Sequence, residues 1–214
     1  MSNHSDRAYG LMVLCPLRSE TGQDQSPEAF LRDFLNDLPQ HELSPMAAVP
    51  NTYLCRFFVL NDVVYQGKPA ALDHLKSKYL AFVAEIHAPE ESDVDEYLRL
   101  MWKLAGGGGF VPKAWQYCLG FESVTNADQF VEYMRRCQIQ TTLYFNGSTD
   151  EPLAEQLKAL YLKQEFTRFA YEHQGLPPAA LQDAFRAFAA RVRPSAATPT
   201  WRPGASSLAT AVIE

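Results

Sequence analysis

Apolar side chains recur along this chain with two different periods, one typical of strands and one typical of helices. Residues 9–15 and 53–60 are apolar at odd and even positions alike, and the second run is rich in aromatic side chains. Such runs predict strands that are covered on both faces. Residues 27–38 carry apolar side chains at helical spacing after a Ser26-Pro27 pair. This pattern predicts an amphipathic helix with a capped start.

The same two patterns continue as far as residue 192. We expect further strands over residues 78–87, 114–121 and 141–145, and helices over residues 92–105, 125–137, 152–173 and 178–192. A short helix is also expected over residues 69–76, whereas the three prolines within residues 39–52 indicate a loop. The three prolines after residue 193 indicate an irregular tail.

The order of these elements predicts an α+β fold. Strand, helix, strand, strand, helix and strand follow one another first, which is the order of a ferredoxin-like antiparallel sheet with helices on one face. We expect a single domain over residues 1–192, with a ferredoxin-like core at about 8–122 and a C-terminal helical extension at about 125–192. An irregular tail follows at 193–214. Because the strands are apolar on both sides, the second face of the sheet needs a cover, either the C-terminal helices or a second copy of the chain.

Composition narrows the functional classes. The chain has 214 residues, 47% of them hydrophobic, and a formal net charge of −6 without a basic block. This balance argues against nucleic-acid binding. The longest early apolar run, residues 8–17, is too short to span a bilayer, so we expect no membrane partner.

The four cysteines are scattered and none forms a C-x-x-C pair. A disulfide framework is therefore not expected, and we predict a cytoplasmic protein.

Arg56 is the most informative single residue, because it lies in the middle of the most apolar strand. A buried guanidinium is costly unless it is paired. It is therefore either an anchor for an anionic ligand, or an arginine at a sheet edge or interface that is paired with a structural carboxylate. Glu85 and His87 share a face at the end of the strand over 78–87, where they could perform acid–base work or simply be polar residues at a strand mouth. Glu85 is also the candidate partner of Arg56.

Aromatic residues supply the remaining candidates. Trp115 and Tyr117 share a face of the strand over 114–121, with Gln116 opposite, and Tyr144 lies in the strand over 141–145. Such stripes form either core packing or an apolar pocket with polar tips. As the functional hypothesis, we assign catalytic roles to Glu85, His87 and Tyr144. Substrate binding is assigned to Arg56, Trp115, Gln116 and Tyr117.

Two other motifs lack the pattern of a phosphate-binding loop and of a metal site. The four glycines at 106–109 follow a helix and precede a strand, the reverse of a phosphate-binding loop, so we interpret them as a helix end and connector. The five histidines show neither H-x-x-x-H nor H-E-x-x-H spacing. We therefore expect no metal site and no cofactor.

Four segments together carry a family resemblance: Arg56 to Leu60 (RFFVL), Tyr79 to Phe82 (YLAF), Asp93 to Leu98 (DVDEYL) and Trp115 to Phe121 (WQYCLGF). Over roughly residues 50–145 the chain resembles uncharacterised bacterial proteins with a ferredoxin-like fold of the dimeric α+β-barrel type. The resemblance implies a homodimer. The wider superfamily includes haem enzymes of the chlorite-dismutase and dye-decolourising-peroxidase kind, cofactor-free monooxygenases, and members without an assigned activity. We find no helix with an inward-facing proximal histidine, so haem is only a minority hypothesis.

Two function hypotheses follow. The first is a small enzyme that acts on a small, partly apolar, acidic molecule by an oxidative or isomerisation step. The second is a non-catalytic binding or protein-interaction module that uses the C-terminal helices. The sequence does not choose between them, and it leaves the question of catalysis open.

Overall fold

The chain forms two compact units, residues 1–150 and 151–214. A computed structural model describes residues 3–19, 25–40, 43–63, 67–68, 74–105, 109–147 and 151–202. Each unit is described by itself below. The expected single domain over residues 1–192 stays a prediction, because this division does not test whether the units fold together.

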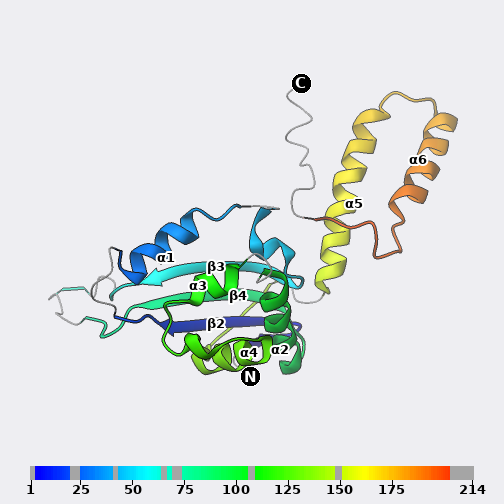
Figure 1. The fold of residues 1–214 in the computed structure, drawn as a ribbon. Helices are drawn as coiled ribbons and strands as arrows, with labels where there is room; N and C mark the ends of the chain where they lie inside the picture. The colour runs from blue at the N-terminus through cyan, green and yellow to red at the C-terminus, as the bar shows by residue number, and fades with distance from the viewer. Residues whose placement is uncertain are drawn as a thin grey trace. The chain divides into compact units, whose positions relative to one another are not determined.

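Unit 1 is built on a four-stranded antiparallel sheet (Figure 1). Its strands are β1 (His4–Ser5), β2 (Ala8–Pro16), β3 (Thr52–Leu60) and β4 (Tyr79–His87), in the order β1-β2-β4-β3. The register sets Gly10 of β2 and Leu54 of β3 on either side of Glu85 of β4. The strands expected over 9–15, 53–60 and 78–87 are therefore confirmed, and so is the α+β class.

Helices flank the sheet of unit 1 (Figure 1). They are α1 (Pro27–Asn36), α2 (Glu91–Leu100), α3 (Phe110–Trp115) and α4 (Ala127–Cys137), together with a π-helical turn, η3 (Met101–Ala105), and two 3-10 turns, η2 (Pro45–Ala48) and η5 (Phe121–Ser123). Ser26 caps α1 by accepting a hydrogen bond from the amide of Ala29. Asn126 caps α4 by accepting a hydrogen bond from the amide of Gln129.

The hydrophobic core of unit 1 lies between one face of the sheet and these helices. Trp115 at the end of α3 is fully buried. Its ring packs edge-on against Phe57 of β3, Phe82 of β4 and Phe130 of α4 at centroid distances of 5.8, 6.0 and 5.6 Å. Edge-on aromatic contacts of this kind stabilise a packed interior beyond the area they bury. The aromatic residues of four elements therefore hold the helices on this face.

The other face of the sheet is open within unit 1. Side chains of one strand alternate between faces, so Leu54, Arg56 and Phe58 of β3 share this face with their cross-strand partners Glu85, Val83 and Ala81. Leu54 is 52% exposed and Phe58 is 40% exposed. We call this surface the open face.

Two strands expected from the sequence are wrong. Residues 114–121 form the end of α3 and the turns after it, and their one bridge among the described residues joins Cys118 to Leu17, just after the end of β2. The buried side chains of α3, Phe110, Val111, Ala114 and Trp115, recur with a helical period. Residues 141–145 form no strand either.

Three sequence features fall partly or wholly outside the described residues. Most of the short helix expected over 69–76 and Gly106 to Gly108 of the glycine run are among them, as is the end of the tail from residue 203. Gly109 is described and has a φ of +78°, a left-handed conformation that glycine adopts without strain.

Unit 2 is a hairpin of the two expected helices, α5 (Leu153–Glu172) and α6 (Pro178–Val192). Phe169, Phe188 and Val192 are its buried apolar residues. The Lys158 ammonium of α5 donates hydrogen bonds to the carbonyls of Val192 and Pro199, both at 2.7 Å. Several large apolar side chains of the hairpin are exposed, namely Leu160, Phe166, Tyr171, Leu176, Leu181 and Phe185.

Candidate functional site

Arg56 lies on β3, the strand at one edge of the sheet, opposite Val83 of β4. The side chain is exposed, because an edge strand lets a long side chain reach solvent. The ion pair with Glu85 that the sequence suggested is not formed: among the described residues, no carboxylate pairs with Arg56. Within the described ranges, its positive charge therefore has no carboxylate partner.

A cavity of about 440 Å³ adjoins Arg56, between the end of α1, the turn η2 and strand β3. We call it the Arg56 cavity. Its lining is mostly apolar, with three polar residues and one cation: Leu35, Asn36, Leu38, Pro39, Gln40, Ser44, Pro45, Met46, Cys55, Arg56, Phe57 and Phe110. Burial raises the pKa of the Cys55 thiol, which disfavours the reactive thiolate.

Glu85 and Tyr144, two of the expected catalytic residues, meet in a different cavity. This Glu85 cavity has a volume of about 430 Å³ and is lined by Tyr53, Leu54, Glu85 and residues 143–147. The Tyr144 ring lies flat over β2 at Gly10, where a built Cβ atom would be 3.0 Å from the ring. This close approach requires a glycine at position 10 in the strand.

The polar tips of this pair are enclosed. Glu85 Oε2 and the Tyr144 hydroxyl are both buried, and neither has a hydrogen-bond partner within the described part of the chain. Burial raises the pKa of Tyr144, and the neighbouring Glu85 carboxylate raises it further. A phenol beside a carboxylate can exchange a proton with it or with a bound molecule.

His87, the third expected catalytic residue, lies on the same strand as Glu85, two residues later. Its Nδ1 atom is 3.1 Å from the Tyr53 hydroxyl, and burial raises the pKa of that tyrosine. Tyr53 lines the Glu85 cavity whereas His87 does not. The three catalytic candidates thus lie at one end of the sheet, but only two of them share a cavity.

The other expected binding residues lie on the covered side of the sheet. Trp115 is in the core, where its indole N–H points to the Cys15 sulfur at 3.3 Å. Tyr117 packs edge-on against Phe30 at 5.2 Å. The exposed Gln116 donates a hydrogen bond to the carbonyl of Lys113 at 3.1 Å. The structure brings none of these three residues to the Arg56 or Glu85 cavity, since the segment that carries them is a helix and a turn.

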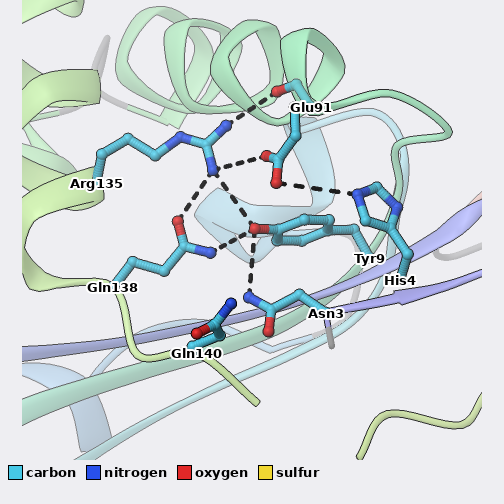
Figure 2. Close-up of a pocket in the computed structure, with 7 residues that line it drawn as sticks. All are labelled: Asn3, His4, Tyr9, Glu91, Arg135, Gln138 and Gln140. Carbon is cyan, nitrogen blue, oxygen red and sulfur yellow. Dashed lines mark hydrogen bonds and ion pairs between the residues drawn. The ribbon is translucent and has the colours of Figure 1, made fainter. Parts of the chain in front are cut away.

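A third, polar cavity was not expected from the sequence (Figure 2). We call it the Tyr9 cavity. It has a volume of about 300 Å³ and is lined by Asn3, His4, Tyr9, Glu91, Arg135, Gln138 and Gln140. These residues come from β1, β2, α2 and α4 and from the turns beside them. Tyr9 and Arg135 are 126 positions apart, so no local pattern could have indicated that they meet.

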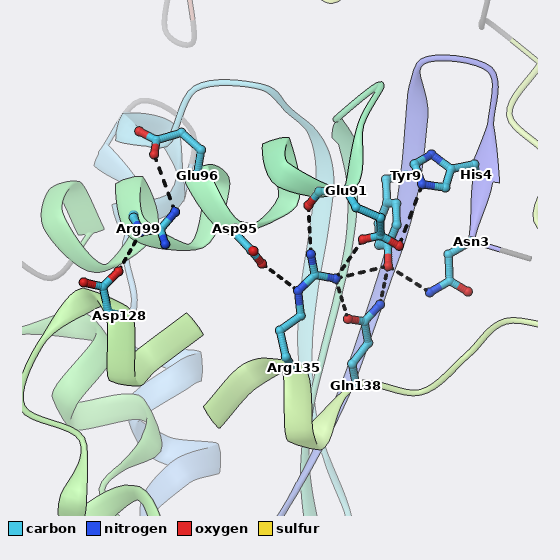
Figure 3. Close-up of polar contacts among 10 residues, drawn as sticks. All are labelled: Asn3, His4, Tyr9, Glu91, Asp95, Glu96, Arg99, Asp128, Arg135 and Gln138. Carbon is cyan, nitrogen blue, oxygen red and sulfur yellow. Dashed lines mark hydrogen bonds and ion pairs between the residues drawn. The ribbon is translucent and has the colours of Figure 1, made fainter. Parts of the chain in front are cut away.

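Arg135 is the centre of the ion pairs beside this cavity (Figure 3). Its guanidinium lies 2.7 Å from the Asp95 carboxylate and 3.1 Å from the Glu91 carboxylate, and it also donates to the backbone carbonyl of Glu91 at 2.9 Å. A second ion pair, between Arg99 and Asp128 at 2.8 Å, joins the same two helices, α2 and α4. The Arg135 charge is therefore matched by two carboxylates, unlike the charge of Arg56.

The described residues show neither a metal site nor a membrane-spanning helix. Among the described residues, no group of three or more histidine, cysteine, aspartate or glutamate side chains could hold a metal ion. Within the same ranges, no helix combines the length and apolar character that a transmembrane segment needs.

Comparison with known proteins gave no assignment. No protein-family model matches the chain, and neither a curated protein nor a solved structure shows significant similarity to it.

Proposed function

We propose that this protein binds a small, partly apolar molecule with an acidic group in the Arg56 cavity. The observation that carries the proposal is a mostly apolar cavity at the edge of the sheet whose lining includes Arg56, a cation that pairs with no carboxylate among the described residues. The apolar residues, such as Leu35, Met46 and Phe57, would bury the apolar part of the ligand. Arg56 would bind its carboxylate or phosphate with two parallel N–H donors.

Binding, rather than chemistry, is the function proposed for this cavity. Among its lining residues, Cys55 and Ser44 carry nucleophilic groups. Burial raises the pKa of Cys55, and the Ser44 hydroxyl accepts a hydrogen bond from the amide of Met46 at 3.3 Å. The enzyme hypothesis instead needs the Glu85 cavity, where Glu85 and Tyr144 could transfer a proton. An oxidative or isomerisation step there stays a prediction, as does the expectation that no cofactor is used, with haem as the minority hypothesis.

A pair of matched probes tests the binding proposal. Phenylacetate and the neutral phenylacetamide have the same apolar part and differ in charge. We expect phenylacetate to bind more tightly by isothermal titration calorimetry. The Arg56→Met variant should lose about tenfold to hundredfold in phenylacetate affinity, because a charge-assisted hydrogen bond contributes about 1.5–3 kcal/mol. Phenylacetamide binding should be unchanged.

A control separates this effect from a general loss of positive charge. Arg186→Met removes an exposed arginine of α6 that pairs with Asp183, and it should leave phenylacetate affinity unaltered. If the two probes bind wild type equally, or if both arginine variants weaken phenylacetate alike, Arg56 is not the anion anchor.

A second candidate function is that of an interaction module whose open face pairs with a second copy of the chain. The observation that favours it is the charge pattern of the exposed apolar face, where Arg56 and Glu85 lie two cross-strand positions apart. A two-fold axis through such a face brings the Arg56 of one copy toward the Glu85 of the other, where Oε2 is buried and Oε1 is the oxygen left to pair with the cation. This candidate includes the expected homodimer.

A charge exchange distinguishes the two functions. In a homodimer, Arg56→Glu and Glu85→Arg should each shift sedimentation equilibrium toward the monomer, and the double variant should restore the dimer. The double variant should not restore phenylacetate binding, because the cation then lies outside the Arg56 cavity. A monomeric wild type at every concentration would remove the dimer proposal and leave the ligand proposal standing.

The finer fold and the cellular location also belong to this proposal. We infer a ferredoxin-like arrangement because β2, β4 and β3 lie in the order of its first, third and second strands. The position beside β2 is taken by β1, and the segment expected as the fourth strand makes only the bridge at Cys118. A cytoplasmic location stays a prediction.

A further inference from the structure

The hydroxyl of Tyr9 is surrounded by hydrogen-bond donors. Tyr9 is 1% exposed, and its oxygen accepts hydrogen bonds from the side-chain nitrogens of Asn3 at 3.3 Å, of Arg135 at 3.4 Å and of Gln138 (Figure 2). An arginine can only donate. The side-chain amides of Asn3 and Gln138 can donate or accept, because their oxygen and nitrogen ends can be exchanged.

Neighbouring contacts fix the orientation of both amides. The oxygen of Gln138 accepts a hydrogen bond from Arg135 at 3.0 Å, so its nitrogen end must face Tyr9. The oxygen of Asn3 accepts from the backbone amide of Thr141 at 2.7 Å, which again turns the nitrogen end toward Tyr9. All three partners of the phenol oxygen are therefore donors.

This arrangement decides where the hydroxyl proton of Tyr9 points. A hydroxyl has two acceptor lone pairs and one proton, and three donors already compete for the lone pairs. No residue in the described ranges accepts the proton. Since the proton must point away from the three donors, it points into the Tyr9 cavity. Buried O–H groups require an acceptor, so the acceptor has to come from a molecule inside the cavity.

The charges around the cavity indicate what kind of molecule fits. Arg135 is matched by Glu91 and Asp95, so no positive charge remains for an anion. His4 lies near Glu91, with 4.0 Å between Nε2 and the carboxylate, and its ring packs edge-on against Tyr9 at 4.7 Å. A volume of about 300 Å³ corresponds to the liquid volume of about ten water molecules.

We propose that the Tyr9 cavity is a second binding site, for a small uncharged polar molecule whose carbonyl or hydroxyl oxygen accepts the hydrogen bond of Tyr9. The site is separate from the Arg56 and Glu85 cavities, with which it shares no lining residue. Its ligand differs in class from the acidic molecule proposed above, since the site offers a neutral donor instead of an unpaired cation.

N-methylacetamide is the probe for this proposal, because it is small, uncharged and carries one strong acceptor oxygen. The full chain is labelled with ¹³C at the tyrosine ζ carbon, next to the hydroxyl, and titrated with the probe while the NMR spectrum is recorded. The Tyr9→Phe variant assigns the Tyr9 signal, because that signal is then missing. We expect a saturable shift of this signal in the wild type.

Substitutions test whether probe binding depends on the Tyr9 hydroxyl. Tyr9→Phe should weaken probe binding about tenfold, measured on an amide signal near the cavity. Tyr133→Phe is the matched control: Tyr133 is also buried, but its hydroxyl donates to the carbonyl of Leu119 outside the cavity, and its loss should leave probe affinity unchanged. Gln140→Trp gives an independent variant at an exposed lining position, where the larger side chain should exclude the probe.

Three results would overturn the proposal. The first is no saturable shift at Tyr9 up to the solubility limit of the probe, which would mean that water alone satisfies the hydroxyl. The second is equal affinity of wild type and Tyr9→Phe. The third is unchanged binding in Gln140→Trp, which applies even if the Tyr9 variant fails to fold.

Discussion

The contact between Gly10 and Tyr144 can be tested by adding a single methyl group. Gly10 lies within β2, and the ring of Tyr144 covers it from the open face. A Cβ atom at position 10 would be 3.0, 3.2 and 3.3 Å from three ring carbons of Tyr144. The Gly10→Ala substitution therefore forces the ring to move away from the strand, and with it the phenol that lies beside Glu85.

Two opposing effects set the change in the free energy of unfolding that Gly10→Ala causes. Replacing a strand glycine by alanine stabilises a protein by about 0.5–1 kcal/mol, because the unfolded chain loses conformational freedom. Overpacking a close contact costs about 1–3 kcal/mol. In the wild type we expect the second effect to win, with a net loss of about 1 kcal/mol. In a Tyr144→Ala background the clash is absent, so the same substitution should stabilise by about 0.5–1 kcal/mol.

Urea denaturation of the four proteins in this cycle measures the effect. The expected interaction energy between the two positions is about 2 kcal/mol, well above the error of additivity for independent sites. The clearest result would be a change of sign: Gly10→Ala destabilises the wild type and stabilises the Tyr144→Ala variant. This comparison does not depend on the absolute size of either effect. If Gly10→Ala has the same effect with and without Tyr144, the ring does not lie on the strand, and the Glu85 cavity loses one of its walls.

The remaining predictions concern the core and the loop after β3. Trp115→Ala should lower the free energy of unfolding by about 3–5 kcal/mol in urea denaturation, whereas Leu143→Ala, at a side chain that is 84% exposed, should change it by no more than about 0.5 kcal/mol. Hydrogen bonds from His74 and from the amides of Leu75 and Val63 lower the pKa of Asp62 to about 2. A lowered carboxyl pKa stabilises the folded state above the ordinary pKa near 3.8 and loses this effect as the pH falls through 2. The stability difference between wild type and Asp62→Asn should accordingly shrink between pH 4 and pH 2, and a constant difference would contradict the assigned contacts.

Strands and long helices could be predicted from the sequence where local pattern and tertiary packing agree. Strands β2, β3 and β4 and helices α5 and α6 come from long runs rich in apolar residues, and each was found close to its expected place. The segment over 114–121 failed because alternating aromatic residues also fit a short helix followed by a turn. Trp115 and Phe110 are buried on one side of α3, and Gly120, with a φ of +80°, sets the turn after it.

The candidate sites were predicted only in part. Glu85 and Tyr144 were both singled out, and the structure brings them into one cavity. Arg56 was expected to be buried and near Glu85, yet it is exposed and adjoins a separate cavity. Which strand lies at the edge of a sheet depends on pairing with distant strands, so a strand's own pattern cannot show whether its cation reaches solvent.

The sequence by itself determined most of the strands and long helices of this protein, because hydrophobic pattern and turn residues act over a few positions. Tertiary structure decided which side chains face one another. Tyr9, Arg135 and Glu91 meet only because β2, α4 and α2 pack together, and the direction of the Tyr9 proton follows from amides that Arg135 and Thr141 orient. Hydrogen bonds act over about 3 Å, so a site assembled from distant segments exists only once the chain has folded.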